Sequence, residues 1–260
     1  NKGLTTDHLV CYLQRCLLKS LSKHFTTDIP IPIREEIGRA DPKTWTTLVD
    51  ENAEKTSALF PRHLAPRVKS YLENIPSYKL ASRKPDKARQ EIEALLDYAH
   101  NRVAAEECKV NNNVFKAEYG TILDDIEKRI RAIEDHSSYD KIYSQMLEYF
   151  VTIKGLKYLR RWNRINRVIH TSVLAHTYVV AVLAMLLCWL EQKTIEDQEK
   201  GRGWTEFQYQ ALLRSLFHDL PESLTGDVIT PVKNRISSIN KKVWPQIEKW
   251  ATKRFVNQAG

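Results

Sequence analysis

The 260-residue sequence has only 8 glycines and lacks the glycine-rich patterns that hold nucleotide phosphates. Neither GxGxxG nor GxxxxGK[ST] occurs, so a Rossmann or P-loop phosphate site has no support. It also lacks runs of alternating polar and apolar residues, which would indicate strands. Hydrophobic residues make up 42% and charged residues 28% of the chain, which excludes an intrinsically disordered protein. Abundant Ala, Leu, Glu, Lys and Arg instead predict an all-α protein.

Cysteine is scarce as well, and its spacing excludes two classes of site. The four cysteines are Cys11, Cys16, Cys108 and Cys188, and no two of them form a CxxC pair. A zinc finger and a disulfide framework are therefore both weakly supported. We expect reduced thiols in a cytoplasmic protein.

Positive charge is concentrated in the second half of the chain. Residues 1–145 carry 23 basic and 22 acidic side chains, whereas residues 146–260 carry 17 and 10. A positive field attracts phosphates, nucleic acids or anionic lipids, although a solvated basic surface gives the same pattern.

One segment, Val173–Leu190, contains eighteen residues without Asp, Glu, Lys or Arg, which is long enough for a membrane span. Six basic residues precede it between Lys154 and Arg167, as they would on a cytoplasmic flank. However, His176 lies inside the segment, and a histidine in a span is costly unless it has a function. We therefore favour a buried central helix, apolar all round, and expect no membrane association.

Helical periodicity dominates the rest of the chain. The expected helices are Thr6–His24, Trp45–Leu59, Ala65–Asn74, Asp86–Cys108, Val114–Glu134, Tyr139–Arg161, Thr205–His218 and Val243–Phe255. Ser137 and Asp140 fit a capping box before the sixth of these helices. The proline-rich stretch Ile29–Ile33 is predicted to be extended and Ile75–Pro85 to be a linker. Pro221 should end the helix that precedes it.

The residues with the clearest chemical meaning are His176 and the adjacent pair His218-Asp219. One neutral imidazole beside one carboxylate suits Mn²⁺, Fe²⁺, Co²⁺, Ni²⁺ or Zn²⁺ better than Ca²⁺. A second histidine from a neighbouring buried helix can complete one side of such an ion. A bound ion would also explain why an apolar helix contains His176.

This pattern resembles the H…HD signature of the HD-domain metal-dependent phosphohydrolases. The finer resemblance is to the 5′-deoxynucleotidase branch and its longer uncharacterised relatives, which read HD-x-x-E-x-L-T-G-D-x-x-T-P-V-K. Nearly every fixed position is matched over the sixteen residues from His218 to Lys233. The branch also has an Arg-Trp pair ahead of the first histidine, as Arg161-Trp162 is here. The resemblance covers about 149–235 and implies an HD-type helical bundle.

The resemblance implies one divalent metal ion held by His176, His218, Asp219 and a further aspartate downstream. The expected ion is Mn²⁺, Co²⁺, Ni²⁺, Fe²⁺ or Zn²⁺, and Mg²⁺ also remains open. No aspartate follows Asp227, and Glu248 is the one acidic residue beyond it. Glu248 is not assigned as a ligand, so the fourth ligand is unknown. We expect the domain to be incomplete at its C-terminal end; a degenerate site is the alternative.

Two carboxylates are candidates for proton transfer. Glu222 lies three residues after Asp219 and could face the same cavity, where it could orient water or protonate a leaving oxygen. It could instead cap a helix or pair with Arg214. The resemblance implies a role for Asp227 near the substrate, although an aspartate after Gly226 could simply close a turn.

Three residues are candidates for substrate binding. Arg161 could grip a phosphate with two hydrogen bonds, or it could belong to a solvated stripe with other basic residues at helical spacing. Trp162 could stack on the sugar or base, or it could be a core residue. Lys233 could help to neutralise the phosphate.

These observations predict two parts, a helical region 1–140 of unknown role and an HD-type phosphohydrolase domain 141–260. The predicted activity is removal of the 5′-phosphate from (deoxy)nucleoside monophosphates by a metal-activated water. A small nucleotide is the expected partner, and a homo-oligomer remains open. The alternatives are an HD nuclease acting on nucleic acid and a catalytically degenerate nucleotide-binding module.

Overall fold

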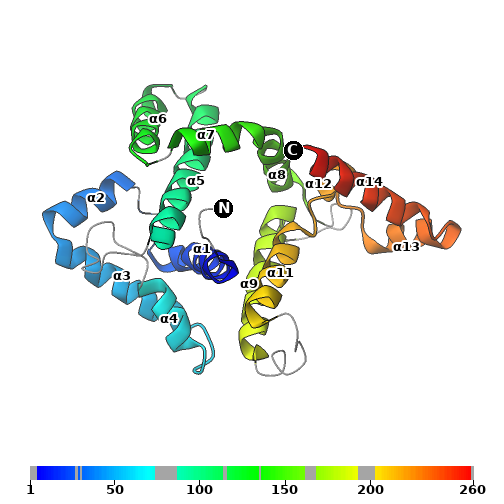
Figure 1. Ribbon diagram of the computed structural model, residues 1–260, viewed down its shortest axis with the longest axis horizontal. Helices are drawn as coiled ribbons and strands as arrows, with labels where there is room; N and C mark the ends of the chain where they lie inside the picture. Colours follow the sequence, from blue (N-terminus) through cyan, green and yellow to red (C-terminus); the bar gives the residue numbers. More distant parts are fainter. Residues whose placement is uncertain are drawn as a thin grey trace. The chain divides into compact units, whose positions relative to one another are not determined.

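The computed structural model describes residues 5–26, 29, 31–73, 87–113, 116–134, 136–161, 168–192 and 203–258. Helices dominate these residues, which confirms the all-α prediction (Figure 1). In chain order they are α1 (Thr6–Thr26), α2 (Ile31–Ala40), α3 (Pro42–Ser57), α4 (Ala65–Glu73), α5 (Lys87–Asn112), α6 (Lys116–Arg131), α7 (His136–Gln145), α8 (Leu147–Tyr158), α9 (Val173–Leu190), α11 (Trp204–Phe217), α12 (Glu222–Thr225), α13 (Thr230–Ile239) and α14 (Val243–Gln258). Within the described ranges, strand-like pairing is limited to one bridge between Arg160 and Ser172.

The helices form two compact units, each built from two stretches of the chain. The first unit comprises residues 1–85 and 177–217, and the second comprises residues 86–176 and 218–260. Helix α9 begins in the second unit and continues into the first. The division into functional domains near residue 140 stays a prediction, because compact packing units need not coincide with functional domains.

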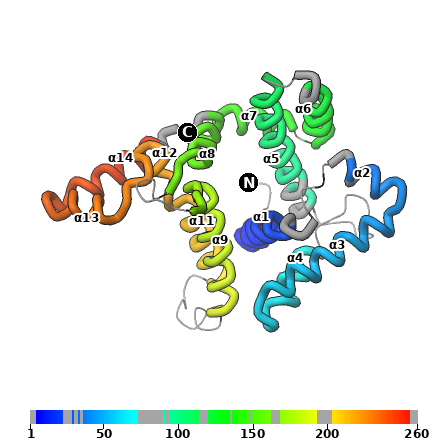
Figure 2. The backbone as a smooth tube through the Cα atoms, turned by 180° about the vertical axis from the view of Figure 1, so that it is seen from behind, coloured from blue at the N-terminus to red at the C-terminus, as the bar shows by residue number. Residues whose placement is uncertain are grey.

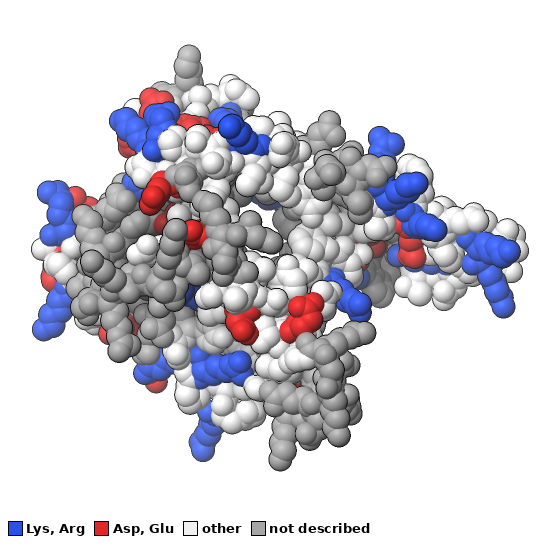
Figure 3. Space-filling view, in the orientation of Figure 1, with Lys and Arg blue, Asp and Glu red and all other residues white. Residues whose placement is uncertain are grey.

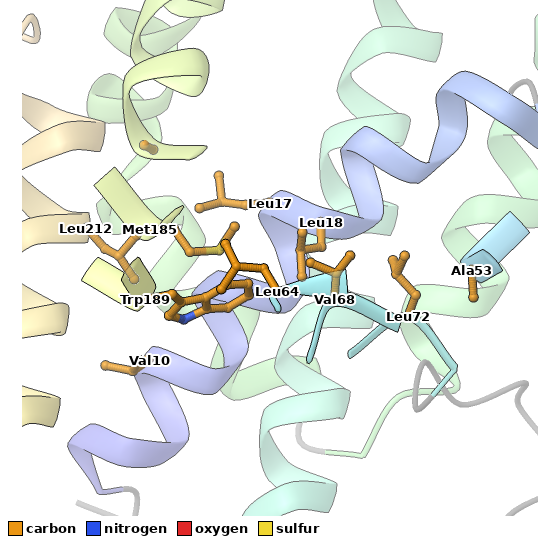
Figure 4. Packing of buried hydrophobic residues seen from close by; sticks show 11 residues of the cluster. Val10, Leu17, Leu18, Ala53, Leu64, Val68, Leu72, Met185, Trp189 and Leu212 are labelled. Atoms are coloured by element: carbon orange, nitrogen blue, oxygen red, sulfur yellow. The ribbon is translucent and has the colours of Figure 1, made fainter. Parts of the chain in front are cut away.

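The core of the first unit is built around one face of α9. Met185 and Trp189 on this helix cluster with Leu18 of α1, Val68 of α4 and Leu212 of α11 (Figure 4). The four helices meet through apolar side chains that are almost fully removed from water. Burial of each such side chain contributes about 1.5–3 kcal/mol relative to exposure, so this cluster is the main source of stability in the unit.

Helix α9 is apolar on both faces but buries only one of them. Val179, Leu183, Leu187 and Leu190 are between 46% and 59% exposed. The prediction of a helix buried all round is therefore wrong for this face. By length and composition alone, α9 could also cross a membrane, a property it shares with core helices of other folds. The absence of membrane association stays a prediction.

Several helix boundaries differ from the sequence predictions. The predicted helix Tyr139–Arg161 is broken at Met146, which separates α7 from α8. The capping box is wrong, because α7 already begins at His136 and Ser137 lies inside it. The prediction of an extended stretch is wrong from Ile31 onward, where α2 begins; Pro32 occupies its first turn, in which proline costs no hydrogen bond. The predicted linker lies outside the described residues.

The amino-terminal half of the second unit contains a polar cluster next to an apolar core. Helices α5 and α6 lie side by side (Figures 1 and 2), and their core includes Tyr98, Ile126 and Ile130. The Tyr98 hydroxyl donates a hydrogen bond of 2.7 Å to Asp140 of α7, and Arg102 also donates to Asp140. Burial, followed by the hydrogen bond to Asp140, raises the pKa of Tyr98 to about 12. The cluster thus joins α7 to α5 by charge-assisted hydrogen bonds.

Replacing Tyr98 by Phe should destabilise the protein by about 1 kcal/mol at pH 8, the usual contribution of one buried hydrogen bond. The folded pKa of Tyr98 lies above its unfolded value of about 10, so its contribution is complete below pH 10 and is lost as the pH rises towards 12. Denaturant unfolding of wild type and Tyr98→Phe between pH 8 and pH 11 measures this difference. A difference that stays constant over this range would contradict the prediction.

Candidate metal centre

The start of helix α9 is fixed by a short antiparallel backbone pairing in the second unit. The backbone N–H of Arg161 donates to the carbonyl of Thr171 at 2.9 Å, and the N–H of Val173 donates to the carbonyl of Leu159 at 2.9 Å. Ser172 caps the helix, because its hydroxyl accepts a hydrogen bond from the N–H of Ala175. The pairing brings the residues after α8 next to the first turn of α9. It explains how Arg161 approaches a histidine fifteen residues further along the chain.

His218 and Asp219 lie in the turn that follows α11. The helix ends at Phe217, before Pro221, as predicted. Leu220, next in sequence, is buried and packs in a cluster with Leu156 of α8 and Val173 of α9. The apolar side chain beside Asp219 therefore anchors the turn against the helix that contains His176.

The structure brings together the three predicted metal ligands. Nε2 of His176 lies 3.7 Å from Oδ2 of Asp219, and Nε2 of His218 lies 3.2 Å from the same oxygen. One donor atom from each residue lies within 4.8 Å of the other two. Two atoms that share an ion at about 2.0–2.2 Å lie roughly 3–4 Å apart, so the set suits one divalent cation. Among described residues, the buried Oδ2 of Asp219 has no hydrogen-bond partner, which further fits a ligand role.

The environment of His176 favours its neutral form. Burial, followed by the positive charge of Arg161, lowers the pKa of His176, and the nearby carboxylates of Asp219 and Asp227 oppose this effect. A histidine must be neutral to bind a metal ion through its ring nitrogen. The lowered pKa of His176 and the short distances between the donor atoms therefore both fit a metal-binding role.

Glu222 begins the short helix α12 one turn after Asp219. Its backbone N–H donates to the carbonyl of Asp219 at 2.9 Å, which closes the turn. Its side chain is 13% exposed, and its Oε2 atom has no hydrogen-bond partner within the described part of the chain. Burial raises the pKa of Glu222 to about 7, helped by the negative charges of Asp219 and Asp227 and opposed by Lys233 and Arg161. Both protonation states are thus accessible near neutral pH.

Asp227 follows a turn that requires glycine. Gly226 has a φ of +71°, in the left-handed region, and its N–H donates to the carbonyl of Glu222 at 2.7 Å. The turn ends α12 and leaves Asp227 half-buried, near enough to influence the pKa values of Glu222 and His176. Asp227 therefore lies near Glu222 and His176, and its role near the substrate stays a prediction.

Arg161 is the described member of the predicted Arg-Trp pair. Its guanidinium has a buried Nε atom without a hydrogen-bond partner among the residues described. Its charge influences both His176 and Glu222, so it lies near both residues. Trp162 lies outside the described residues.

Lys233 reaches the cluster from the first turns of α13. Its Nζ atom lies 3.8 Å from Oε1 of Glu222 and 5.2 Å from the centre of the Trp244 ring. Trp244 was not predicted from the sequence, because it belongs to no motif and lies eleven residues from Lys233. Glu248 is outside the three-residue metal cluster, and its Oε1 accepts a hydrogen bond of 2.6 Å from the Trp244 indole. The fourth metal ligand therefore stays unidentified.

Comparison with known proteins finds similarity to one family in the region that contains this cluster. The family model described as 5′-deoxynucleotidase YfbR-like matches residues 148–259, which include every site residue discussed above. The resemblance to 5′-deoxynucleotidases that the sequence indicated is confirmed for this region. The matching curated relatives include the 5′-deoxynucleotidases YfbR of Salmonella arizonae (32% identity; 43% of this chain and 52% of the relative covered), Shigella boydii serotype 18 (32%; 42% and 51%) and Escherichia coli O127:H6 (33%; 42% and 51%).

The chain spans about half the length of these curated relatives. No solved structure matched it. The matched region contains the site residues described above, whereas residues 1–147 lie outside it.

Removing two of the three clustered donors should abolish tight metal binding by the YfbR-like region. We expect wild type to bind about one equivalent of Mn²⁺ or Co²⁺ and the double variant His218→Ala/Asp219→Ala to bind none, measured by elemental analysis after dialysis. His170→Ala is the matched control, because His170 is an exposed histidine of the same unit. Equal metal content in wild type and the double variant would contradict the assignment.

Proposed function

We propose that the chain is a metal-dependent phosphohydrolase that removes the 5′-phosphate of (deoxy)nucleoside monophosphates. The observation that carries the proposal is the meeting of His176, His218 and Asp219 in a region similar to 5′-deoxynucleotidases. These three residues would hold one divalent ion, either a transition metal or Mg²⁺. Bound there, the ion would supply a Lewis acid that makes water more acidic and offsets negative charge on a phosphate.

The charged residues around the proposed metal ion would bind the phosphate, transfer a proton and orient water or a sugar hydroxyl. Arg161 carries a planar guanidinium, which suits a phosphate because it can donate two parallel hydrogen bonds. Burial, helped by nearby negative charges, raises the pKa of Glu222 to about 7. Glu222 is therefore suited to accept a proton from the attacking water or to donate one to the leaving oxygen. Asp227 is suited to orient the water or a sugar hydroxyl, because a carboxylate accepts hydrogen bonds.

The hydrolysis breaks the bond between phosphorus and the 5′ oxygen and forms a new bond between phosphorus and a water oxygen. The water loses a proton, and the 5′ oxygen gains one, so the products are a nucleoside and inorganic phosphate. Trp162 would stack on the base or sugar, because it is aromatic and follows the proposed phosphate-binding Arg161 in sequence. A cytoplasmic setting is part of the proposal, because all four cysteines are free thiols.

A nuclease is the second candidate, because α13 and α14 expose many basic side chains (Figure 3). The exposed basic residues of this segment are Arg235, Lys241, Lys242, Lys249, Lys253 and Arg254. Such a surface binds nucleic-acid backbones with a steep dependence on salt. The relatives are all named as deoxynucleotidases, so the mononucleotide is the favoured substrate.

Phosphate release from a panel of nucleoside monophosphates tests the proposed activity. The full chain is stripped of metal and then supplied with Mn²⁺, Co²⁺, Ni²⁺, Zn²⁺ or Mg²⁺ in turn, and single-stranded oligonucleotides are assayed in parallel. We expect release from 5′-monophosphates that depends on added metal and falls to background in His218→Ala/Asp219→Ala. Cleavage of oligonucleotides without release from mononucleotides would favour the nuclease. Folded wild type that is inactive towards both would favour a degenerate binding module.

Glu222→Gln should lower kcat by about 10²- to 10⁴-fold, the range for loss of a general acid or base. Gln has the size of Glu but cannot exchange a proton, so metal content and KM should change little. Glu107→Gln is the matched control, because Glu107 is an exposed glutamate of the same unit. Wild-type kcat in Glu222→Gln would exclude the proposed role.

A further inference from the structure

Lys233 lies between a carboxylate of the candidate site and the face of an aromatic ring. Its ammonium is 3.8 Å from Glu222 and 5.2 Å from the ring centre of Trp244. The Glu222 side chain is 13% exposed, and Trp244 is buried. Such partial removal from water makes the contacts of the ammonium stronger than those of an exposed lysine.

The ring that contacts Lys233 is itself fixed. The indole N–H of Trp244 donates to Glu248 one turn later on α14, at 2.6 Å. Helices α13 and α14 lie side by side (Figures 1 and 2), which brings the ring of one helix over the lysine of the other. A cation within about 6 Å of an indole centre is attracted by the negative face of the ring. The contacts thus run from Glu248 through Trp244 and Lys233 to Glu222.

We propose that Trp244 is a positioning residue that holds the ammonium of Lys233 beside Glu222. This inference rests on the proposed function, because it concerns the carboxyl group assigned to proton transfer. With the ammonium fixed, Glu222 has a counter-charge at one place and keeps a single side-chain orientation. Without the ring, the flexible lysine can turn towards water, and Glu222 loses that constraint.

Lys233 could position Glu222 or bind the substrate phosphate, and these two roles predict different kinetic effects. A lysine that positions Glu222 affects the chemical step and therefore kcat. A lysine that binds substrate phosphate equally in ground and transition states affects KM. The contact with the Trp244 ring favours the first role, because it directs the ammonium towards Glu222.

Steady-state kinetics of the metal-loaded full chain with a nucleoside 5′-monophosphate tests the inference. Trp244→Leu should lower kcat by about tenfold with KM within twofold, because a misplacement of about 1 Å can cost as much as 10²-fold. Trp244→Phe keeps an aromatic face and should lose about threefold or less. Trp250→Leu is the matched control, because Trp250 is an exposed tryptophan of the same helix, and both constants should be unchanged.

The double variant Lys233→Gln/Trp244→Leu should be no slower than the worse single variant, because both changes interrupt the same chain of contacts. Losses that multiply would overturn the inference, and so would a raised KM with unchanged kcat in Trp244→Leu. Lys233→Gln retains the buried ring, so the inference can still be tested if Trp244→Leu does not fold.

The indole N–H resonance of Trp244 in ¹⁵N-labelled protein gives a readout that needs no activity. It should shift in Lys233→Gln and Glu248→Gln, whereas the resonance of Trp250 should stay in place. An unchanged Trp244 resonance in Lys233→Gln would overturn the inference. If wild type releases no phosphate but this resonance shifts as expected, the proposed function fails while the contact between lysine and ring stands.

Discussion

Leu220 packs with Val173 and Leu156 in an apolar cluster on which the geometry of the metal centre depends. Leu220 follows Asp219 directly, and Val173 precedes His176 by one turn of α9. Burial of two apolar side chains therefore fixes the backbone from which two of the three donors extend. A truncation that left a cavity here would cost about 2–5 kcal/mol and would also separate the ligands. Stability and function thus rely on the same contact.

Acidic side chains gather next to this packed core. Asp219 and Asp227 lie close to Glu222, and burial followed by their negative charges raises the pKa of Glu222 to about 7. Buried carboxylate oxygens without hydrogen bonds are expensive, and both Asp219 and Glu222 contribute one within the described residues. A divalent ion would offset this cost on one side, as Lys233 does on the other. These buried acidic groups are therefore consistent with the proposed binding of a divalent cation.

The resemblance to a family motif predicted most of the candidate site, because the motif residues are close in sequence. The run from His218 to Lys233 contains two metal donors and the proton-transfer candidates, and α12 folds it back on itself. His176 was predictable as a polar residue in an otherwise apolar helix. Trp244 was not, because its role depends on the packing of α13 against α14, which periodicity does not specify. The unburied face of α9 was missed for a similar reason, since a uniformly apolar helix does not reveal which face finds a partner.

The basic charge of the second half has two physically different parts. Exposed residues such as Lys249 and Lys253 act through water, where charges are screened beyond about 8–10 Å. They can raise the local concentration of phosphate-bearing molecules but cannot orient one. Lys233 and Arg161 are partly buried, and the positive charge of each opposes the rise in the pKa of Glu222. Glu248, the one acidic residue after Asp227, holds the ring that contacts Lys233. The carboxylate of Glu248 thus helps to hold the ammonium of Lys233 in place through the Trp244 ring.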